Sequence, residues 1–286
     1  MNIIVTGGAG FIGSNLVYRL LDLGHKVSII DNLSTGKIER LKEQIDGKRL
    51  ESLIVRDLST YEPEGYGDID VIFHLAAFSR VNPSFKTPKL AYEYNVNGTM
   101  NVLEMARKLD CRLIYAGSST VDEKYSSPYG FTKYLGEEHC KFYNILYGLR
   151  ASIARFYNVY GQNQIGSGDF ATLIGIFEKQ KEKGESLTIT GDGEQRRDFV
   201  HVSDIVDGLI AISELDDREC RAFNLGSGKN YSVNEIANLI SDDIKYIPER
   251  QGEARETLAD ISETTAATGW KPKINLKEYL NDNKRS

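Results

Sequence analysis

A tyrosine and a lysine, Tyr129 and Lys133, are spaced i, i+4 in a segment whose pattern predicts a helix over about 129–147. On a helix this spacing puts both side chains on one face. A free tyrosine has a pKa of ~10 and is a poor base at neutral pH, but a nearby ammonium favours its phenolate form. The hydroxyl of Ser118, at the end of an apolar run, could share a substrate proton with Tyr129. These three residues predict acid–base chemistry on an alcohol.

Each of these residues also has a structural interpretation. Y-x-x-x-K pairs are frequent on solvated helix faces, and runs such as Gly117–Thr120 often form turns and caps. Their position favours the chemical interpretation, because the run follows the predicted strand Arg112–Ala116. Ligands of parallel sheets bind at the carboxyl ends of the strands.

A second chemical feature is the glycine-rich turn with Gly7, Gly10 and Gly13 in G-x-x-G-x-x-G spacing. It lies between the apolar run Ile3–Val5 and a helical pattern over 16–23. A strand, a glycine turn and a helix N-terminus together form the usual site for the pyrophosphate of a dinucleotide. The turn therefore predicts dinucleotide binding, with Lys133 able to hold the nicotinamide ribose.

Asp31 follows the predicted strand Lys26–Ile30. A carboxylate at this place can accept hydrogen bonds from both hydroxyls of the adenosine ribose and would repel a 2′-phosphate. It favours NAD over NADP. The alternative is a solvated turn aspartate, since Asp-Asn is a common turn pair.

Strand-like and helix-like patterns alternate through the first half of the chain. Strands are predicted at 3–5, 26–30, 52–55, 71–77, 112–116 and 152–156, and long helices at 88–108 and 129–147. Repeated β-α units predict an α/β fold with a doubly wound parallel sheet, the Rossmann arrangement.

The pattern weakens after Asn158, which predicts a smaller, interleaved C-terminal α/β substrate lobe. We expect an NAD-binding domain at 1–160, rejoined by about 198–225, with the substrate lobe formed by 161–197 and 226–286. The further expected elements are a loop at 161–170, a helix at 171–183 and a strand at 186–189. The segment 199–202 then leads into a helix at about 203–213, capped by Ser203 or Asp204.

The composition excludes several classes of protein. A net charge of −6 over 286 residues argues against a nucleic-acid binder, and no apolar run is long enough to span a bilayer. The three cysteines, Cys111, Cys140 and Cys220, are odd in number and widely spaced, which predicts free thiols and no zinc site. Because the chain enters a strand at once, no signal peptide is expected and the predicted location is the cytoplasm. His74 and His201 are interpreted as structural.

Taken together, the motifs resemble one family. Besides those above they are Asp31–Gly36, Arg56-Asp57, His74–Ala77, Asn95–Thr99, Arg155–Gly161 and Gly191–Val202. The chain resembles the extended short-chain dehydrogenases/reductases, and among them the nucleotide-sugar epimerases and dehydratases related to UDP-glucose (UDP-galactose) 4-epimerases. The similarity runs from Thr6 to the Gly269–Pro272 stretch.

The resemblance implies a role for each matching residue. The residues implied to bind NAD are Gly7, Gly10, Phe11, Ile12, Gly13, Asp31, Asn32, Ser34, Thr35, Gly36, Asp57, Leu58, Leu75, Ala76, Ala77, Asn95, Ser118, Tyr129, Lys133 and Tyr157. Those implied to bind a nucleotide-diphosphate sugar, with UDP favoured, are Arg80, Ser84, Ser118, Tyr129, Asn158, Arg197 and Arg250. Arg255 is a second candidate for the diphosphate. Ser118, Tyr129 and Lys133 are the implied catalytic residues, and a homodimer through a four-helix bundle is implied as well.

One departure from the family bears on the reaction. The 4,6-dehydratases place an Asp-Glu pair directly after the catalytic hydroxyl, where this chain has Ser119 and Thr120, and its own Asp122-Glu123 comes later. Epimerisation at C4 is therefore favoured over dehydration, and decarboxylation is disfavoured for the same reason. The alternative is another nucleotide-sugar-modifying enzyme of the family, a 4,6-dehydratase, a decarboxylase or a reductase. A non-catalytic dinucleotide-binding protein is a further alternative, because the loop between Ser118 and Tyr129 is shorter than in the relatives.

Overall fold

The computed structural model describes residues 1–61, 65–249, 252 and 254–282. Its centre is a seven-stranded sheet of order β10-β6-β5-β4-β1-β2-β3, in which every neighbouring pair is parallel. The strands are β1 (Asn2–Thr6), β2 (Lys26–Asp31), β3 (Ser52–Val55), β4 (Val71–His74), β5 (Arg112–Ser118), β6 (Ala151–Phe156) and β10 (Ala222–Leu225). The order reverses between β1 and β4, and a ligand crevice forms at such a switch point.

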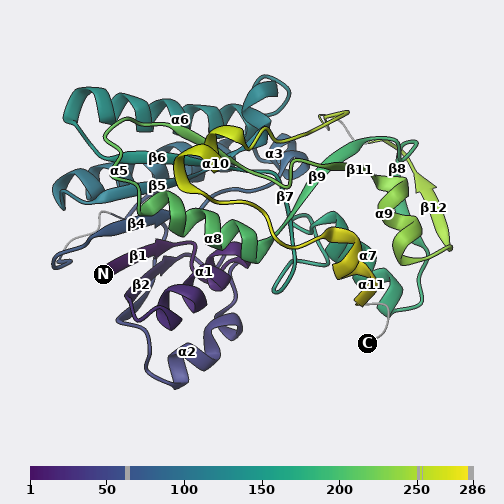
Figure 1. Cartoon of the computed structure of the whole chain (residues 1–286), viewed down its shortest axis with the longest axis horizontal. Helices are drawn as coiled ribbons and strands as arrows, with labels where there is room; N and C mark the ends of the chain where they lie inside the picture. Colours follow the sequence, from purple (N-terminus) through teal and green to yellow (C-terminus); the bar gives the residue numbers. More distant parts are fainter. Residues whose placement is uncertain (62–64, 250–251, 253, 283–286) are drawn as a thin grey trace.

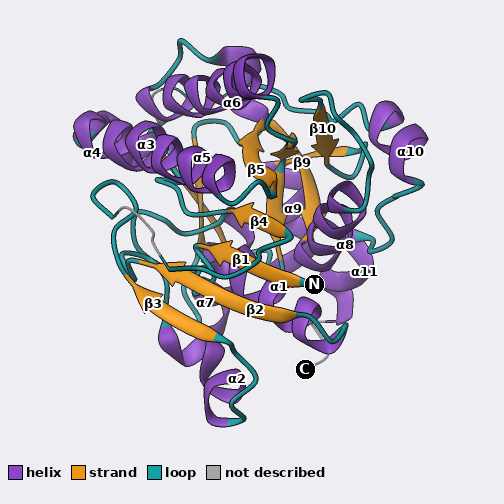
Figure 2. Cartoon of the chain, turned by 90° about the vertical axis from the view of Figure 1, so that its left-hand side faces the viewer, coloured by secondary structure: helices purple, strands orange, loops and turns teal. Residues whose placement is uncertain are grey.

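Helices cover both faces of this sheet, which is why its central strands are almost wholly apolar. In Figure 2 the helices α1 (Phe11–Asp22) and α8 (Val202–Ser213) lie on one side of the strands, and α5 (Gly98–Lys108) and α6 (Pro128–Tyr147) lie on the other. One core cluster joins α1 and α8 to the sheet and a second joins α5 and α6 to it. The predicted doubly wound parallel sheet is confirmed.

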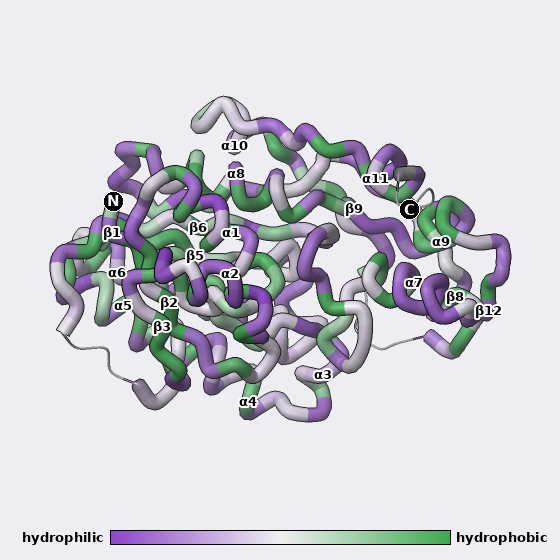
Figure 3. Tube along the Cα trace, turned by 90° about the horizontal axis from the view of Figure 1, so that it is seen from below, coloured by the Kyte–Doolittle hydropathy of each residue, from purple (hydrophilic) through white to green (hydrophobic). Residues whose placement is uncertain are grey.

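A smaller group of elements lies at the other end of the molecule (Figure 1). One sheet has the order β11-β9-β7 and a two-stranded sheet pairs β12 with β8. These strands are β7 (Asn158–Tyr160), β8 (Leu187–Thr190), β9 (Arg196–His201), β11 (Asn230–Ser232) and β12 (Ile244–Ile247). They pack with α7 (Leu173–Glu182), α9 (Val233–Ile240) and α11 (Leu276–Asp282) around a third core cluster. Helix α9 is mostly green in Figure 3, as its valine, isoleucine and alanine side chains require.

The remaining helical segments connect these layers. They are η1 (Ile38–Leu41), α2 (Lys42–Asp46), α3 (Val81–Lys86), α4 (Pro88–Tyr92), η2 (Glu93–Asn97), η3 (Ser119–Glu123) and α10 (Ser262–Thr268). In the described part of the chain, no helix is both long and apolar enough to cross a membrane.

Several predicted boundaries were wrong. Strand β4 ends at His74, so the predicted strand residues up to Ala77 leave the sheet, and β5 continues to Ser118. The predicted helix 88–108 contains a π-helical segment, η2, between α4 and α5. Helix α8 is capped by neither Ser203 nor Asp204, because the ring Nδ1 of His201 accepts the hydrogen bond from the Ser203 amide at 3.2 Å.

Candidate active site

The glycine turn between β1 and α1 lies at the switch point of the sheet. Gly7 has φ 71°, and a Cβ there would stand 2.7 Å from the amide nitrogen of Ala76. A Cβ on Gly13 would collide with the carbonyl of Gly7. Only glycine therefore fits at these two positions, and the turn has the close backbone approach that a pyrophosphate site requires.

Asp31 ends β2 beside this turn. Its carboxylate accepts hydrogen bonds from the amides of Ala9, at 2.9 Å, and Leu33, at 2.8 Å. Burial raises the pKa of Asp31, while these amides and the charge of Arg40 act in the opposite direction. These two amides thus hold the carboxylate in place at the position where the sequence predicts the adenosine ribose of a dinucleotide.

A groove runs from this turn across the carboxyl ends of the strands. Of the residues implied to bind NAD, it is lined by Gly7, Gly10, Phe11, Ile12, Gly13, Asp31, Asn32, Ser34, Thr35, Asp57, Leu58, Leu75, Ala76, Ala77, Tyr129 and Lys133. Sequence reasoning missed Arg56, Ser59, Ser79, Tyr94 and Ile165, which also line it. Arg56 had a signal, since it precedes Asp57 in a family motif, whereas Tyr94 reaches the groove from the π-helical segment η2.

Four residues implied to bind the cofactor do not line the groove, and two of them, Ser118 and Tyr157, line the adjoining cleft instead. Gly36 packs against Asp31, where a Cβ would stand 2.8 Å from the carboxylate. Asn95 is buried, and its amide group is engaged by both backbone polar groups of Phe78 and by the Thr132 hydroxyl. Asn95 therefore ties η2 to the chain after β4 and to α6, which is a structural role.

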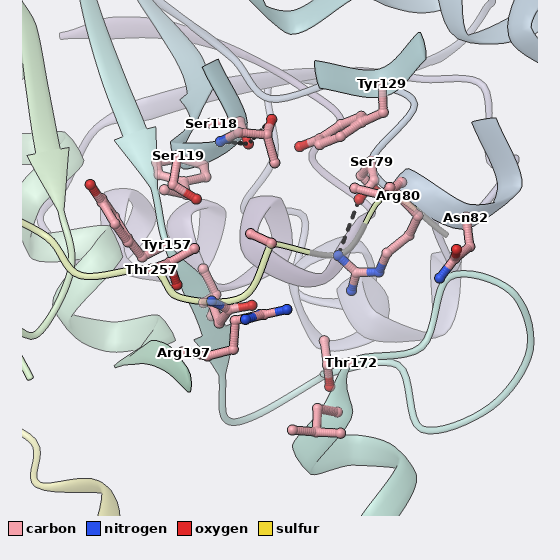
Figure 4. Close-up of a pocket in the computed structure, with 18 of the residues that line it drawn as sticks. Ser79, Arg80, Asn82, Ser118, Ser119, Tyr129, Tyr157, Thr172, Arg197 and Thr257 are labelled. Atoms are coloured by element: carbon pink, nitrogen blue, oxygen red, sulfur yellow. Dashed lines mark hydrogen bonds between the residues drawn. The ribbon is translucent and has the colours of Figure 1, made fainter. Parts of the chain in front are cut away.

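A larger cleft of about 970 Å³ adjoins the groove and extends towards the smaller group of elements that includes β8, β9 and α7. It is lined by the predicted residues Arg80, Ser118, Tyr129, Tyr157, Asn158 and Arg197. Tyr129 and Arg80 line both the groove and the cleft. Figure 4 shows the Tyr129 hydroxyl directed towards Ser118, and the guanidinium groups of Arg80 and Arg197 facing each other across the cavity.

The short loop before α6 keeps Ser118 and Tyr129 together. Ser118 ends β5 and η3 follows directly, so the chain turns back within a few residues to α6. Burial raises the pKa of Tyr129, whereas a hydrogen bond with Ser118 and the charge of Arg80 lower it. The hydroxyl of Ser118 also lies 2.9 Å from that of Thr120.

The lysine of the pair has a different environment from the one expected. The Nζ of Lys133 lies 4.4 Å from the centre of the Tyr115 ring. Burial lowers the pKa of Lys133 to about 8, although Glu137 acts in the opposite direction. Sequence reasoning gave Lys133 as the charge that favours the Tyr129 phenolate. In this structure the side-chain cation that lowers the pKa of Tyr129 is Arg80, because its guanidinium enters the same cavity.

Ser84 was implied to contact the sugar nucleotide, and the structure corrects this. Its side chain is buried and lies outside the cleft lining among the described residues. Its hydroxyl accepts a hydrogen bond from the Tyr129 amide at 3.1 Å and donates one to the Val81 carbonyl at 2.6 Å. Ser84 therefore positions the first turn of α6.

The residues implied to hold the diphosphate do not all lie in the cleft. Arg197, from β9, points into the cleft, and Asn158 lines the cleft while donating to the Asp198 carbonyl at 3.3 Å. Arg255 is turned away, because both ends of its guanidinium pair with Asp192 at 2.9 Å. Arg250 lies outside the described residues.

The late acidic pair is not remote from the site. Both Asp122 and Glu123 line the cleft, because η3 turns this segment back beside Ser118. Both acids are exposed at the wall of the cleft, so their distance along the chain does not by itself keep them away from the cleft.

A parallel sheet that carries this turn and a Tyr-Lys pair defines a short-chain dehydrogenase/reductase of the NAD-binding type. Residues 3–226 match the NAD dependent epimerase/dehydratase family, and the chain belongs to this family.

Two curated relatives show the range of reactions among similar proteins. A Methanocaldococcus jannaschii protein with the provisional name UDP-glucose 4-epimerase is 38% identical over 97% of this chain and 95% of its own length. UDP-glucuronic acid decarboxylase 1 of Xenopus tropicalis is 31% identical over 98% of this chain and 70% of its own.

Two solved structures have the same fold over nearly the whole chain. The UDP-N-acetylglucosamine 4-epimerase of Methanobrevibacter ruminantium, in complex with UDP-N-acetylmuramic acid, has a TM-score of 0.90 and 33% identity, covering 98% of this chain and 96% of its own. The UDP-glucuronic acid 4-epimerase of Bacillus cereus, in complex with UDP-glucuronic acid and NAD, has a TM-score of 0.88 and 28% identity, covering 98% and 96%.

Proposed function

We propose that this protein epimerises a nucleotide-diphosphate sugar at C4, with a UDP-hexose as substrate and a transient 4-keto sugar as intermediate. The observation that carries the proposal is the position of Tyr129. Its phenol lies where the cofactor groove meets the cleft, with the Ser118 hydroxyl beside it. A sugar hydroxyl placed there meets an acid–base pair on one side and the cofactor on the other.

In the proposed reaction, four side chains have distinct roles. Tyr129 removes the proton from the C4 hydroxyl and returns it after the sugar has turned, while Ser118 holds that oxygen. Lys133 and Asp31 hold the two riboses of NAD, which supplies hydride acceptance and return when bound. Burial raises the pKa of Tyr129, and the hydrogen bond with Ser118 and the charge of Arg80 oppose that rise.

The diphosphate of the substrate stays bound in the cleft while the sugar turns. Arg197 and Asn158 lie on the second-lobe side of the cleft, and a guanidinium fork matches phosphate oxygens. We assign Arg250 to the same group on the resemblance alone. Anchoring at this end leaves the sugar free to present either face near Tyr129.

The proposed division of labour extends to the whole chain. We assign residues 1–160 and about 198–225 to NAD binding, and residues 161–197 and 226–286 to the substrate lobe. We also propose a homodimer through α5 and α6. On α6 the large apolar side chains of Phe131, Phe142, Ile145 and Leu146 are exposed, with Ile145 at 84%, whereas Leu103 of α5 is buried core.

Proton NMR of the purified protein with added NAD⁺ tests the reaction. UDP-glucose, UDP-N-acetylglucosamine and UDP-glucuronate are offered separately. The expected result is a new anomeric signal from the C4 epimer of one of them, with the nucleotide intact and no net NADH. No epimer from any of these, or from GDP-, dTDP- and ADP-linked sugars, would contradict the proposal.

A second reaction class is favoured by one observation. Asp122 and Glu123 line the cleft, and carboxylic acids at this edge could move a second proton. The relatives that are named decarboxylases keep this alternative open. It predicts a stable 4-keto product or a shortened sugar in the same NMR experiment.

A further inference from the structure

Arg80 is the residue whose surroundings the proposed reaction leaves unexplained. It lies between β4 and α3 and lines both the groove and the cleft. Figure 4 shows its guanidinium extending into the cavity from the side of Tyr129, opposite Arg197. An arginine at the sugar end of the cleft is not needed to hold a diphosphate at the other end.

Backbone carbonyls fix the side chain of Arg80 in this position. Its Nε donates to the carbonyl of Phe170 at 3.0 Å, and its Nη1 donates to the carbonyl of Ser79 at 3.1 Å. These bonds orient the guanidinium while leaving N–H groups at its tip for a ligand, because arginine carries five donors. The loop that contributes Phe170 thus holds Arg80 ready in the cavity.

Within the described part of the chain, the guanidinium also lacks an acidic partner. Among the residues that the structure describes, no aspartate or glutamate forms an ion pair with Arg80, and the titratable group that acts on it is the phenol of Tyr129. Burial lowers the pKa of Arg80, yet arginine remains protonated in proteins. Arg80 is half-buried, and a partly desolvated cation is costly unless an anion pairs with it, so a bound ligand is the natural source of that anion.

The position of Arg80 in the cleft indicates which part of the nucleotide sugar this residue contacts. The diphosphate belongs to the Arg197 side, whereas Arg80 shares its cavity with Tyr129, the residue that acts on C4. We propose that Arg80 binds a carboxylate that the hexose carries close to C4, so that this enzyme prefers acidic nucleotide sugars to neutral ones. This inference rests on the proposed function for the placement of the sugar. The carboxylate could be C6 of a uronic acid or an acidic ether on O3, and both present the same chemistry to a guanidinium.

Dissociation constants measured by calorimetry on the NAD-loaded protein test this preference. Two matched pairs separate the sources of the carboxylate: UDP-glucuronate against UDP-glucose, and UDP-N-acetylmuramate against UDP-N-acetylglucosamine. We expect the acidic member of at least one pair to bind about tenfold or more tighter, the usual effect of a charge-assisted hydrogen-bonded pair. Equal binding within both pairs would overturn the inference.

Variants then assign the preference to Arg80. Arg80→Met should abolish it while leaving the affinity for the neutral sugar within about threefold, and Arg80→Lys should retain part of it because the charge remains. Lys86→Met is the matched control, since Lys86 lines the same cleft but is exposed and pairs with Asp169 at 3.6 Å. It should leave the ratio within each pair unchanged. A loss of NAD affinity in Arg80→Met, or an equal loss for both members of a pair, would contradict the role.

This binding measurement does not depend on turnover. If the acidic sugar binds tighter through Arg80 but no C4 epimer forms, the proposed reaction fails and the inference stands. If neutral and acidic sugars bind equally well and are epimerised equally well, the inference fails and the reaction stands.

Discussion

The backbone amide of Tyr129 donates a hydrogen bond to the hydroxyl of Ser84, 3.1 Å away, across 45 positions of sequence. The amide lies in the first turn of α6, where no intrahelical acceptor is available. Ser84 therefore attaches the segment after β4 to the residue that carries the proposed chemistry.

Replacing Ser84 by alanine should lower kcat more than it raises KM. The partly buried amide of Tyr129 loses its partner, which costs about 1–3 kcal/mol and loosens the first turn of α6. We expect a kcat about tenfold lower with unchanged NAD affinity. Ser213→Ala, which removes a hydroxyl bonded only to the nearby Ile210 carbonyl, is the control and should keep the wild-type kcat. A rise in KM alone would restore Ser84 to a substrate-contact role.

Tyr129→Phe should abolish turnover and leave NAD bound. The change removes the hydroxyl but keeps the ring that lines the groove, and loss of a positioned acid–base group costs on the order of 10²–10⁴-fold in rate. Ser118→Ala should cost less, because Ser118 assists without taking the proton. NAD retention is read from fluorescence of the bound cofactor after reduction. Full activity of Tyr129→Phe would refute the base assignment.

Lys133→Met should raise the stability of the NAD-free protein while it lowers activity. Burial lowers the pKa of Lys133 to about 8 from the ordinary lysine value of 10.5, so the unfolded chain binds this proton more strongly than the folded protein does. The charged form of Lys133 therefore lowers the free energy of unfolding by at most about 3 kcal/mol, and this penalty is complete below about pH 8. The penalty decreases as the pH rises and vanishes above about pH 10.5, where the lysine is uncharged in the folded and the unfolded chain. The measurement is the Tm difference between variant and wild type at pH 7 and pH 10.5. A difference that does not shrink with rising pH would contradict this origin.

The sequence predicted the repeating framework of this fold because local periodicity encodes it. Alternating apolar runs and helices specify the parallel sheet, and Gly7 and Asp31 follow directly from chemistry at strand ends. The roles of Ser84 and Asn95 could not be predicted, since their hydrogen bonds reach Tyr129, Phe78 and Thr132 across the fold. Spacing along the chain also could not show that Asp122 lines the cleft, because a 3₁₀ turn places it there.

The pair Asp122→Asn and Glu123→Gln separates epimerisation from elimination. Epimerisation at C4 needs the one proton that Tyr129 moves, so each variant should keep kcat within about threefold of wild type. Elimination or C5 chemistry needs a second acid–base group, and its loss would cost about 10²-fold or more. The readout is the initial rate of product formation by NMR. A large loss for either variant would assign the reaction to the second class. Glu194→Gln, outside the cleft lining, is the matched control.

The proposed dimer can be disrupted without touching the site. Phe142 and Ile145 of α6 are exposed at 50% and 84%, and neither lines the groove or the cleft. Burying such side chains drives association, and a buried unpaired carboxylate opposes it. We therefore expect sedimentation velocity to show a dimer for the wild type and a monomer for Phe142→Glu combined with Ile145→Glu. Tyr246→Glu, exposed at 56% on β12 of the second lobe, should remain a dimer. A monomeric wild type, or a dimer that survives the double substitution, would place any contact between copies elsewhere.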